Sequence, residues 1–320
     1  MSALEIQRKI GVGYGFNSTA FVAKYEGRKV AVKTVPTDHI RDGTINGSNN
    51  GSSTVSEAMK HEGALLSMIG HHPNIVRFVG TAHDTTHAYI VSEYEEGGNL
   101  QERTQATTPV GGVGVGARAA EPVSGGVACR LVRDAAAGLE CSHAGRVLHN
   151  DVAARNCLLS TADLSAHGCT LKLADFGLST LRPRHSHADF ITGGDNQYPI
   201  GWMAPEALHP PHVFSEASDS YSLGCLVYEI TAGERPWAGL DFSEVRRLVG
   251  EGKKLTAPAS LKSSPALHQL FDDCLATDAA KRPTMPEVIK RMASCRPPGR
   301  SSVLDLAAND AARAHPKAGW

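Results

Sequence analysis

Residues 148–159 read LHNDVAARNCLL and place an aspartate and an asparagine five positions apart between two apolar pairs. Asp151 offers a carboxylate that can accept the proton of an attacking hydroxyl, and Asn156 offers an amide oxygen that can hold Mg²⁺ beside phosphate groups. Arg155 stands directly before the asparagine and brings a permanent positive charge. These residues predict a phosphoryl-transfer site, although an ordinary polar loop could contain the same residue types.

A glycine-rich stretch near the start of the chain, IGVGYGFNSTAFVAKYEGRKVAVK, is a candidate phosphate-binding segment. Gly11 and Gly13 could open a dinucleotide-binding turn, but that turn needs a third glycine and a following helix. A strand-like run follows instead. The register Gly13, Gly15, Ser18 and Ala20 fits better, because a hairpin of small residues lets the backbone lie close to phosphate groups.

Lys33 ends the apolar run that follows this hairpin, and a buried ammonium group needs a counter-charge or a phosphate. Glu62, in the next expected helix, is the natural partner for this charge. Farther along, Asp175 begins an Asp-Phe-Gly run after a strand-like stretch, where its carboxylate could hold a metal that bridges phosphate groups. These three residues extend the candidate phosphoryl-transfer site beyond the loop at 148–159.

The order of these groups along the chain is more specific than any one of them. It runs from a glycine loop through a strand lysine, a helix glutamate, the Asp–Asn loop and Asp-Phe-Gly to Ala-Pro-Glu: residues 13–20, Lys33, Glu62, 151–156, 175–177 and 204–206. On these motifs the sequence resembles the eukaryotic protein kinases across residues 5–295. Two further positions match the family: Asp219, where a helix aspartate braces the catalytic loop, and Arg282, where an arginine pairs with Glu206.

The resemblance implies an α+β, bilobal protein-kinase-like fold, in which ATP lies between a small antiparallel β lobe with one helix (αC) and a larger, mainly helical lobe. It implies that Asp151, in the catalytic loop at 149–156, orients the acceptor hydroxyl and takes its proton, while Arg155 neutralises charge near the γ-phosphate. Asn156 and Asp175 are the implied Mg²⁺ ligands. The residues that the resemblance assigns to the nucleotide are Gly13, Gly15, Ser18, Ala20, Ala31, Lys33, Glu62, Ser92, Glu93 and Glu95.

The segment SEYEEGGNL resembles the hinge between the two lobes of this family. In it, Ser92 takes the gatekeeper position, and backbone groups from Glu93 to Glu95 are expected to face adenine.

Two markers bear on the acceptor hydroxyl. Serine/threonine kinases usually carry a lysine two residues after the catalytic aspartate, whereas this chain has Ala153 there and a cation at Arg155, which is similar to the DLAARN run of tyrosine kinases. In QYPIGWMAPEAL, Pro199 and Trp202 follow the tyrosine-kinase pattern, and Gly201 replaces the usual basic residue. Tyrosine is the expected acceptor. The alternatives are a serine/threonine or dual-specificity kinase, then a nucleotide-binding pseudokinase scaffold without turnover, and a small-molecule kinase.

Two further positions concern regulation. The family has an arginine at the position of Asn150, where it meets a phosphate on the activation loop. In the expected activation segment, residues 175–206, the only tyrosine is Tyr198, next to a proline where the family often has a structural aromatic residue. We therefore expect a segment that is held without phosphorylation, with Asp189 or Asp195 as a source of fixed charge.

The elements expected around these motifs are strand-rich first and helical later. Alternating or β-branched runs predict strands at 20–24, 29–35, 75–79, 88–93 and 170–173. Apolar residues at helical spacing predict helices at 56–69, 127–143 and 219–231.

We place the small lobe at residues 1–94 and the large lobe at 95–296. The stretches 41–53 and 107–126 are rich in small and polar residues, which predicts flexible insertions. The polar, Ala-rich tail at 297–320 is expected to be disordered.

The composition of the 320-residue chain limits the alternatives. A formal net charge of −1 gives no general attraction to nucleic acid, and no stretch is apolar over the length of a signal peptide or membrane span. Seven scattered cysteines without a CxxC pair predict reduced thiols. We expect a cytoplasmic protein, or the cytosolic domain of a larger one, that acts on a protein substrate.

The chain has 15 histidines, and pairs such as His83/His87 and His185/His187 lack the Cys or carboxylate framework of a metal site. The resemblance gives His149 a structural place, with its imidazole below Phe176 and with Leu66 and Phe78 extending the apolar stack.

Overall fold

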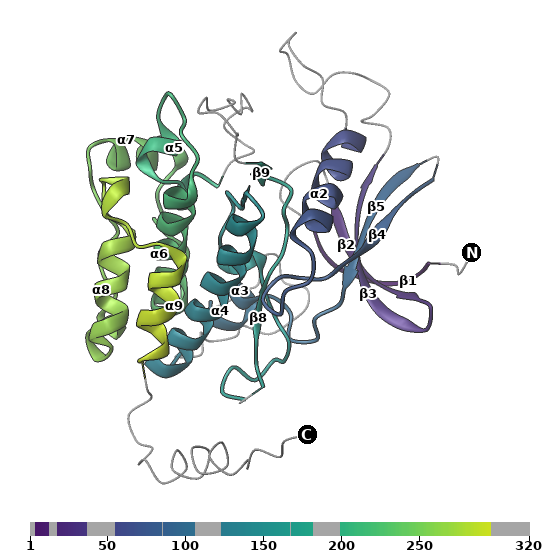
Figure 1. Ribbon diagram of the computed structural model, residues 1–320, viewed down its shortest axis with the longest axis horizontal. Helices are drawn as coiled ribbons and strands as arrows, with labels where there is room; N and C mark the ends of the chain where they lie inside the picture. The colour runs from purple at the N-terminus through teal and green to yellow at the C-terminus, as the bar shows by residue number, and fades with distance from the viewer. Residues whose placement is uncertain are drawn as a thin grey trace, which may run out of the picture.

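The computed structural model describes residues 4–12, 18–36, 55–84, 86–105, 123–166, 168–181 and 199–295. Figure 1 shows that they form two lobes, one a five-stranded sheet with a single helix and the other a larger body of helices. The predicted bilobal α+β fold is confirmed. The expected insertion at 41–53, most of that at 107–126 and the tail at 297–320 lie outside the described residues.

The small lobe is built on a sheet in the order β1-β2-β3-β5-β4, in which all neighbours are antiparallel. Its strands are β1 (Glu5–Val12), β2 (Thr19–Tyr25), β3 (Arg28–Pro36), β4 (Phe78–His83) and β5 (His87–Glu93). One face buries Ala23, Val30, Val32 and Val91 in a single cluster. Because side chains alternate along a strand, Lys33 lies on the other face of β3.

Three of the strands predicted for this lobe are found within one or two residues, whereas β1 was not among the predictions. The strand predicted at 75–79 is wrong in its start, since β4 begins at Phe78. Ile75 instead forms a bridge with Leu173 of the large lobe, and Val76 N donates to Leu173 O at 2.9 Å. The apolar run at 75–76 therefore joins the two lobes.

Helix α2 (Val55–Ile69) follows β3 in the chain and packs against β4 and β5 (Figure 1). Leu65 and Leu66 are buried in a cluster with Phe176 of the large lobe. The helix ends before Gly70, whose φ of 77° lies in the left-handed region that glycine adopts without strain. The helix predicted at 56–69 is confirmed.

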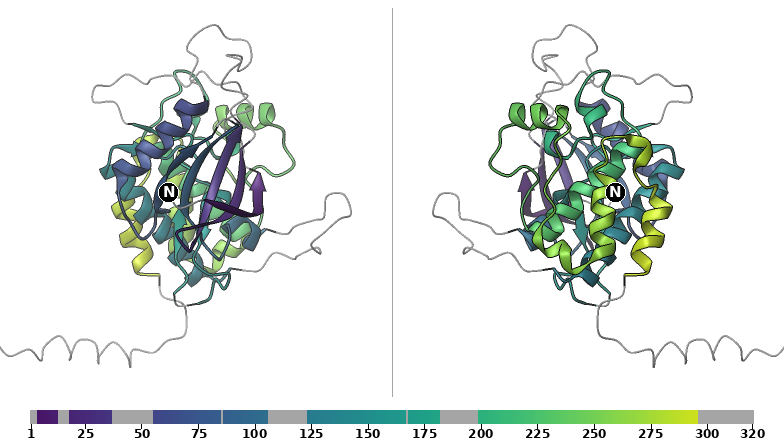
Figure 2. Two further views of the ribbon diagram at one scale, coloured as in Figure 1. Left: turned by 90° about the vertical axis from the view of Figure 1, so that its right-hand side faces the viewer. Right: turned by 90° about the vertical axis from the view of Figure 1, so that its left-hand side faces the viewer.

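The helices of the large lobe are α3 (Leu100–Thr104), α4 (Gly125–Ala144), α5 (Pro205–Leu208), α6 (Glu216–Ala232), α7 (Phe242–Gly250), α8 (Pro265–Cys274) and α9 (Met285–Ala293). Helix α6 is buried along most of its length, and Figure 2 shows α9, in yellow, on the outside of the lobe. The two predicted helices here are confirmed; α4 begins at Gly125, so the last residues of the insertion predicted at 107–126 are helical. Within the described residues, no helix combines the length and apolarity needed to cross a bilayer.

Two short strand pairs hold at their ends the loop from β6 (Val147–Leu148) to β7 (Cys157–Leu159) and the loop from β8 (Leu171–Leu173) to β9 (Thr180–Leu181). Strand β6 pairs with β9, and β7 pairs with β8. The loop from β6 to β7 contains the 3₁₀ turn η1 (Ala154–Asn156). Ala174 N donates to Asn156 O at 2.9 Å, so this loop and the one after β8 lie side by side.

Candidate active site

Three charged side chains from three different elements meet between the lobes. Lys33 Nζ of β3 lies 3.2 Å from Glu62 Oε2 of α2 and 2.6 Å from Asp175 Oδ1, which follows β8. Burial alone would lower the pKa of Lys33, but the two carboxylates raise it above its usual value, so the ammonium stays charged. Burial also opposes ionisation of Asp175, but the nearby Lys33 keeps the pKa of Asp175 below its usual value. The predicted Lys33–Glu62 pair is present, and Asp175 completes it.

The loop between β6 and β7 holds a second carboxylate. Asp151 is only 8% exposed, and its Oδ1 accepts from Arg155 Nη2 while its Oδ2 accepts from Asn156 Nδ2 at 2.8 Å. Burial raises the pKa of Asp151, and the charge of Arg155 opposes that rise. The three residues that sequence analysis placed at the centre of the chemistry are therefore in direct contact.

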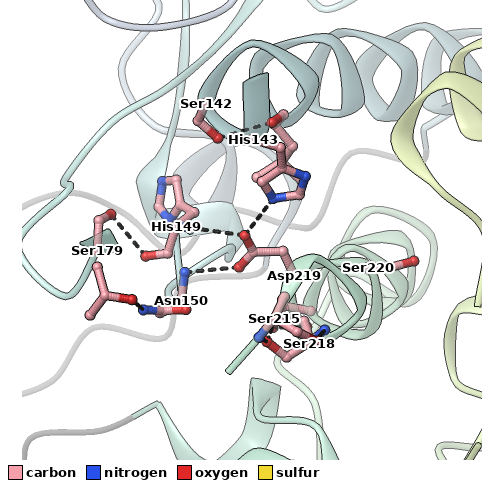
Figure 3. A network of polar contacts seen from close by, with 12 residues as sticks. Ser142, His143, His149, Asn150, Ser179, Ser215, Ser218, Asp219 and Ser220 are labelled. Atoms are coloured by element: carbon pink, nitrogen blue, oxygen red, sulfur yellow. Dashed lines mark hydrogen bonds and ion pairs between the residues drawn. The ribbon is translucent and has the colours of Figure 1, made fainter. Parts of the chain in front are cut away.

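The backbone of this loop is anchored on α6 through Asp219, as Figure 3 shows. Asp219 is fully buried and accepts from His149 N at 2.9 Å, Asn150 N at 2.8 Å and His143 Nε2 at 2.8 Å. Burial opposes the charge, but donation from His143 lowers the pKa of Asp219 below its usual value. The predicted bracing contact is present, and His143 is a partner that the sequence did not reveal.

An apolar stack connects the loop to α2. The rings of His149 and Phe176 are 4.6 Å apart between centroids, and Phe176 shares a buried cluster with Leu66 and the partly buried Phe78. The predicted stack is therefore present. Burial lowers the pKa of His149, which keeps the imidazole neutral in this apolar setting.

A cleft lies between the two lobes, and the charged cluster of Lys33, Glu62 and Asp175 forms part of its lining. The full lining is Ser18, Ala20, Lys33, Glu62, Leu66, Val76, Ile90, Ser92, Leu158, Ala174 and Asp175. Of the residues predicted to contact the nucleotide, Ala31, Glu93 and Glu95 are not part of this lining. Gly13 and Gly15 lie outside the described residues.

Sequence reasoning missed the apolar lining of the cleft, in which Leu158 comes from β7 of the large lobe. Its signal in the sequence is the apolar residue two positions after Asn156.

The hinge side chains turn toward the large lobe. Lys172 Nζ of β8 lies 2.6 Å from both Glu93 Oε1 and Glu95 Oε1. Burial alone would lower the pKa of Lys172, but the two carboxylates raise it. Both glutamates were predicted to offer backbone groups to adenine, and their side chains have this separate role in joining β5 to β8.

A buried glutamate on α6 joins the catalytic loop to the segment after residue 199. Glu229 Oε2 accepts from Ala154 N at 2.8 Å and from Trp202 Nε1 at 2.9 Å. The guanidinium of Arg155 lies over the Trp202 ring at 4.6 Å, which favours a cation–π contact. Burial raises the pKa of Glu229 to about 7. The signal for Glu229 in the sequence is an acid within the apolar stretch 223–230.

The Ala-Pro-Glu motif is fixed by the predicted arginine. Arg282 donates from Nη1 to Glu206 Oε1 at 2.6 Å and from Nη2 to Glu206 Oε2 at 2.8 Å. This paired geometry is the strong form of an Arg–carboxylate contact. It holds α5 against the residue that directly follows the 3₁₀ turn η5 (Ala279–Lys281), and so supports the neighbouring segment that carries Trp202.

The donor set suits a divalent cation bound together with phosphate oxygens. Asp175 supplies a carboxylate, Asn156 supplies an amide, and the contact from Ala174 to Asn156 brings their loops together. Mg²⁺ is typically held by one or two protein oxygens plus substrate phosphates and water rather than by a full protein cage. Consistent with that, the described residues contain no cluster of three or more His, Cys, Asp or Glu side chains around one point.

Comparison with known protein families gives one match that spans most of the chain. A family model described as protein tyrosine and serine/threonine kinase matches residues 4–292. The match covers both lobes, from β1 to α9, and includes every described residue of the cleft.

Proposed function

Because the chain belongs to the protein tyrosine and serine/threonine kinase family, we propose that it transfers the γ-phosphoryl group of ATP to a protein hydroxyl, with tyrosine as the favoured acceptor. The observation that carries this proposal is that two groups of side chains lie side by side. The Lys33–Glu62–Asp175 cluster lines the cleft, and Asp151 and Asn156 lie on the neighbouring loop, whose Asn156 O accepts from Ala174 N at 2.9 Å.

In this proposal Asp151 orients the acceptor hydroxyl and accepts its proton as the phosphoryl group is transferred. Its raised pKa supports that role, because a base whose pKa is closer to neutrality accepts a proton more readily. Arg155, which contacts Asp151, places positive charge near the transferred group. Lys33 and the glycine loop position the phosphates, and Glu62 holds the lysine in place.

Mg²⁺, when bound, neutralises the charge that develops on the phosphate oxygens. We propose Asp175 and Asn156 as its protein ligands. Asn156 Nδ2 is engaged by Asp151 Oδ2 at 2.8 Å and by Asp151 O at 2.9 Å, which leaves the amide oxygen as the group that suits a cation. For adenine, we propose the backbone of Glu93 to Glu95 as the partner.

Tyrosine as the acceptor is supported by the surroundings of Arg155. The absence of a lysine at Ala153 leaves Arg155 as the cation of the loop, and Trp202 holds its guanidinium at 4.6 Å. Trp202 belongs to the segment that begins at Pro199, where the family resemblance implies support for a flat aromatic ring. A serine/threonine or dual-specificity kinase is the second candidate, since the family includes both classes.

We also propose that the small lobe spans residues 1–94 and the large lobe 95–296. Strand β5 ends at Glu93 and α3 begins at Leu100, so the chain crosses between the lobes in the stretch bound by Lys172. All seven cysteines are free thiols, which supports a reducing, cytosolic location.

The proposal is tested by phosphoamino-acid analysis of a tyrosine-, serine- and threonine-containing peptide library after incubation with the protein, ATP and Mg²⁺. We expect phosphotyrosine. Phosphoserine or phosphothreonine without phosphotyrosine would overturn the tyrosine assignment. Absence of any label, with retained nucleotide binding, would favour the nucleotide-binding scaffold.

A further inference from the structure

The side chain of Asn150 ties the catalytic loop to the segment that follows Asp175. Its Nδ2 donates to Leu178 O at 3.0 Å and to Thr180 Oγ1 at 3.0 Å. The residue is only 8% exposed, so water competes little with these two bonds. Both acceptors are neutral, and both amide hydrogens are used.

The backbone of Asn150 aims the side chain in this direction. Its φ is 63°, in the left-handed region, and its N–H donates to Asp219 Oδ1 at 2.8 Å (Figure 3). Asparagine is one of the few non-glycine residues that adopt this conformation readily. Two oxygen acceptors face the amide nitrogen, and Oδ1 has no partner among the described residues. The contact with Leu178 therefore fixes the amide orientation, because the flipped form would set Oδ1 against the carbonyl oxygen of Leu178.

Other contacts hold the same segment from two further directions. Ser179 Oγ donates to His149 O at 3.0 Å, and Ser179 O lies 3.0 Å from His61 Nε2 of α2. Thr180 pairs with Leu148 in the β6–β9 ladder. Residues 178–180 are thus bound to the catalytic loop and to α2 immediately after Asp175 and Phe176.

We propose that Asn150 is a positioning residue: its amide clamps residues 178–180 onto the catalytic loop and so keeps Asp175 beside Lys33 without a phosphate on the segment. The inference rests on the proposed kinase function and adds its regulation. An arginine at this position needs an anion to satisfy its charge, whereas the shorter, neutral amide binds the backbone directly. Asp189 and Asp195, which the sequence suggested as fixed charges, lie outside the described residues.

The sharpest variant is Asn150→Gly in the full chain. Glycine keeps the positive φ and the N–H bond to Asp219, so only the clamp is removed. Asn150→Asp keeps the shape but sets a carboxylate oxygen against Leu178 O, while the Thr180 hydroxyl can still donate to it. We expect kcat to fall roughly tenfold in Asn150→Gly, since two hydrogen bonds are lost, and to fall also in Asn150→Asp, since repulsion replaces the bond to Leu178 O. The KM for peptide should change by less than about twofold in both variants. Amide exchange in residues 178–181 should become faster, while exchange in α6 stays unchanged.

Thr180 supplies a matched pair of variants in case a change at Asn150 prevents folding. Thr180→Val removes one acceptor, and Thr180→Ser keeps it, so the valine variant should show the lower kcat and the faster exchange. Phosphatase treatment of the parent protein should leave kcat unchanged.

The clamp would be overturned if Asn150→Gly had the same kcat and the same amide exchange in residues 178–181 as the parent protein. Loss of activity on phosphatase treatment of the parent would also overturn it. If the parent protein transfers no phosphate, the proposed function fails. The exchange comparison then still tests the clamp, which predicts faster exchange in Asn150→Gly.

Discussion

The catalytic loop and the charge cluster in the cleft both depend on buried carboxylates, but the carboxylates bind different kinds of group. Asp219 and Glu229 stand on one helix, α6, and accept hydrogen bonds from the backbone of the loop at 149–154. Lys33, Glu62 and Asp175 come from three elements in two lobes and bind one another's side chains.

We expect the carboxylates of α6 to matter mainly for the stability of the protein, and the Lys33–Glu62–Asp175 cluster to matter mainly for its activity. A carboxylate that accepts backbone N–H groups within one lobe is formed as that lobe folds, and removing it leaves several buried donors unpaired. A cluster that spans two lobes exists only while the lobes are closed, so its loss should disturb alignment of the phosphates more than folding. The following variants each remove a contact from one of these two regions.

The largest loss of stability is expected for Asp219→Ala. It leaves three buried donors without an acceptor, among them His149 N and Asn150 N, and should lower the free energy of unfolding by about 3–5 kcal/mol. Urea unfolding measures this change. Asp163→Ala is the control, because Asp163 accepts from Ser165 in an exposed turn; a similar loss in both variants would contradict the anchoring role of Asp219.

Glu229 should make stability depend on pH. In the folded protein the pKa of Glu229 is about 7, whereas the usual pKa of a glutamate is 4.5. Between these two pH values the folded protein holds a proton on Glu229 that the unfolded chain does not, so folding takes up a proton. The stability that this group contributes is therefore complete below pH 4.5 and is lost as the pH rises to 7, by up to about 3 kcal/mol. Unfolding of the parent and of Glu229→Gln should diverge over this interval. Parallel pH profiles would show that Glu229 does not take up the proton.

Lys33→Met tests the charge cluster in the cleft. Loss of the cation should lower kcat/KM about 100-fold, because the phosphates lose a positioned charge, while the melting temperature changes less than in Asp219→Ala. Kinetics and thermal unfolding of the same preparation give both values. If Lys33→Met lowered the melting temperature as much as Asp219→Ala does and kept its activity, Lys33 would serve stability rather than activity.

The smallest effect is expected at the hinge. Lys172→Met removes the cation shared by Glu93 and Glu95, and should cost about 1–2 kcal/mol of unfolding free energy because the group is partly buried. Lys29→Met removes an exposed pair with Glu96 and should leave the free energy of unfolding nearly unchanged. Equal costs would mean that the hinge contact behaves as a surface ion pair.

Residues in short local motifs were predictable from the sequence, whereas contacts between distant elements were not. Lys33, Asp151, Asn156 and Asp175 lie in short runs whose spacing indicates their chemistry, and the structure brings their loops together. The partners of Glu229 were not predictable. Its contact with Ala154 spans 75 positions, which a local pattern does not contain.

Strand predictions failed where packing overrides the local pattern. The apolar run at 75–76 looks like a strand start, but Ile75 and Val76 are buried against Leu173 of the other lobe. Strand β1 was missed because its side chains are mostly exposed, so burial imposes little alternation on them.

We propose Asp151 as the base of a phosphoryl-transfer site whose charge cluster, Lys33, Glu62 and Asp175, forms independently of it. The most direct test compares transfer from ATP to a tyrosine peptide by the parent and by Asp151→Asn, with binding of a non-hydrolysable ATP analogue measured in both. We predict that turnover falls about 10²- to 10⁴-fold while analogue affinity changes less than about twofold. Turnover by Asp151→Asn equal to that of the parent would contradict the role of Asp151 as the base.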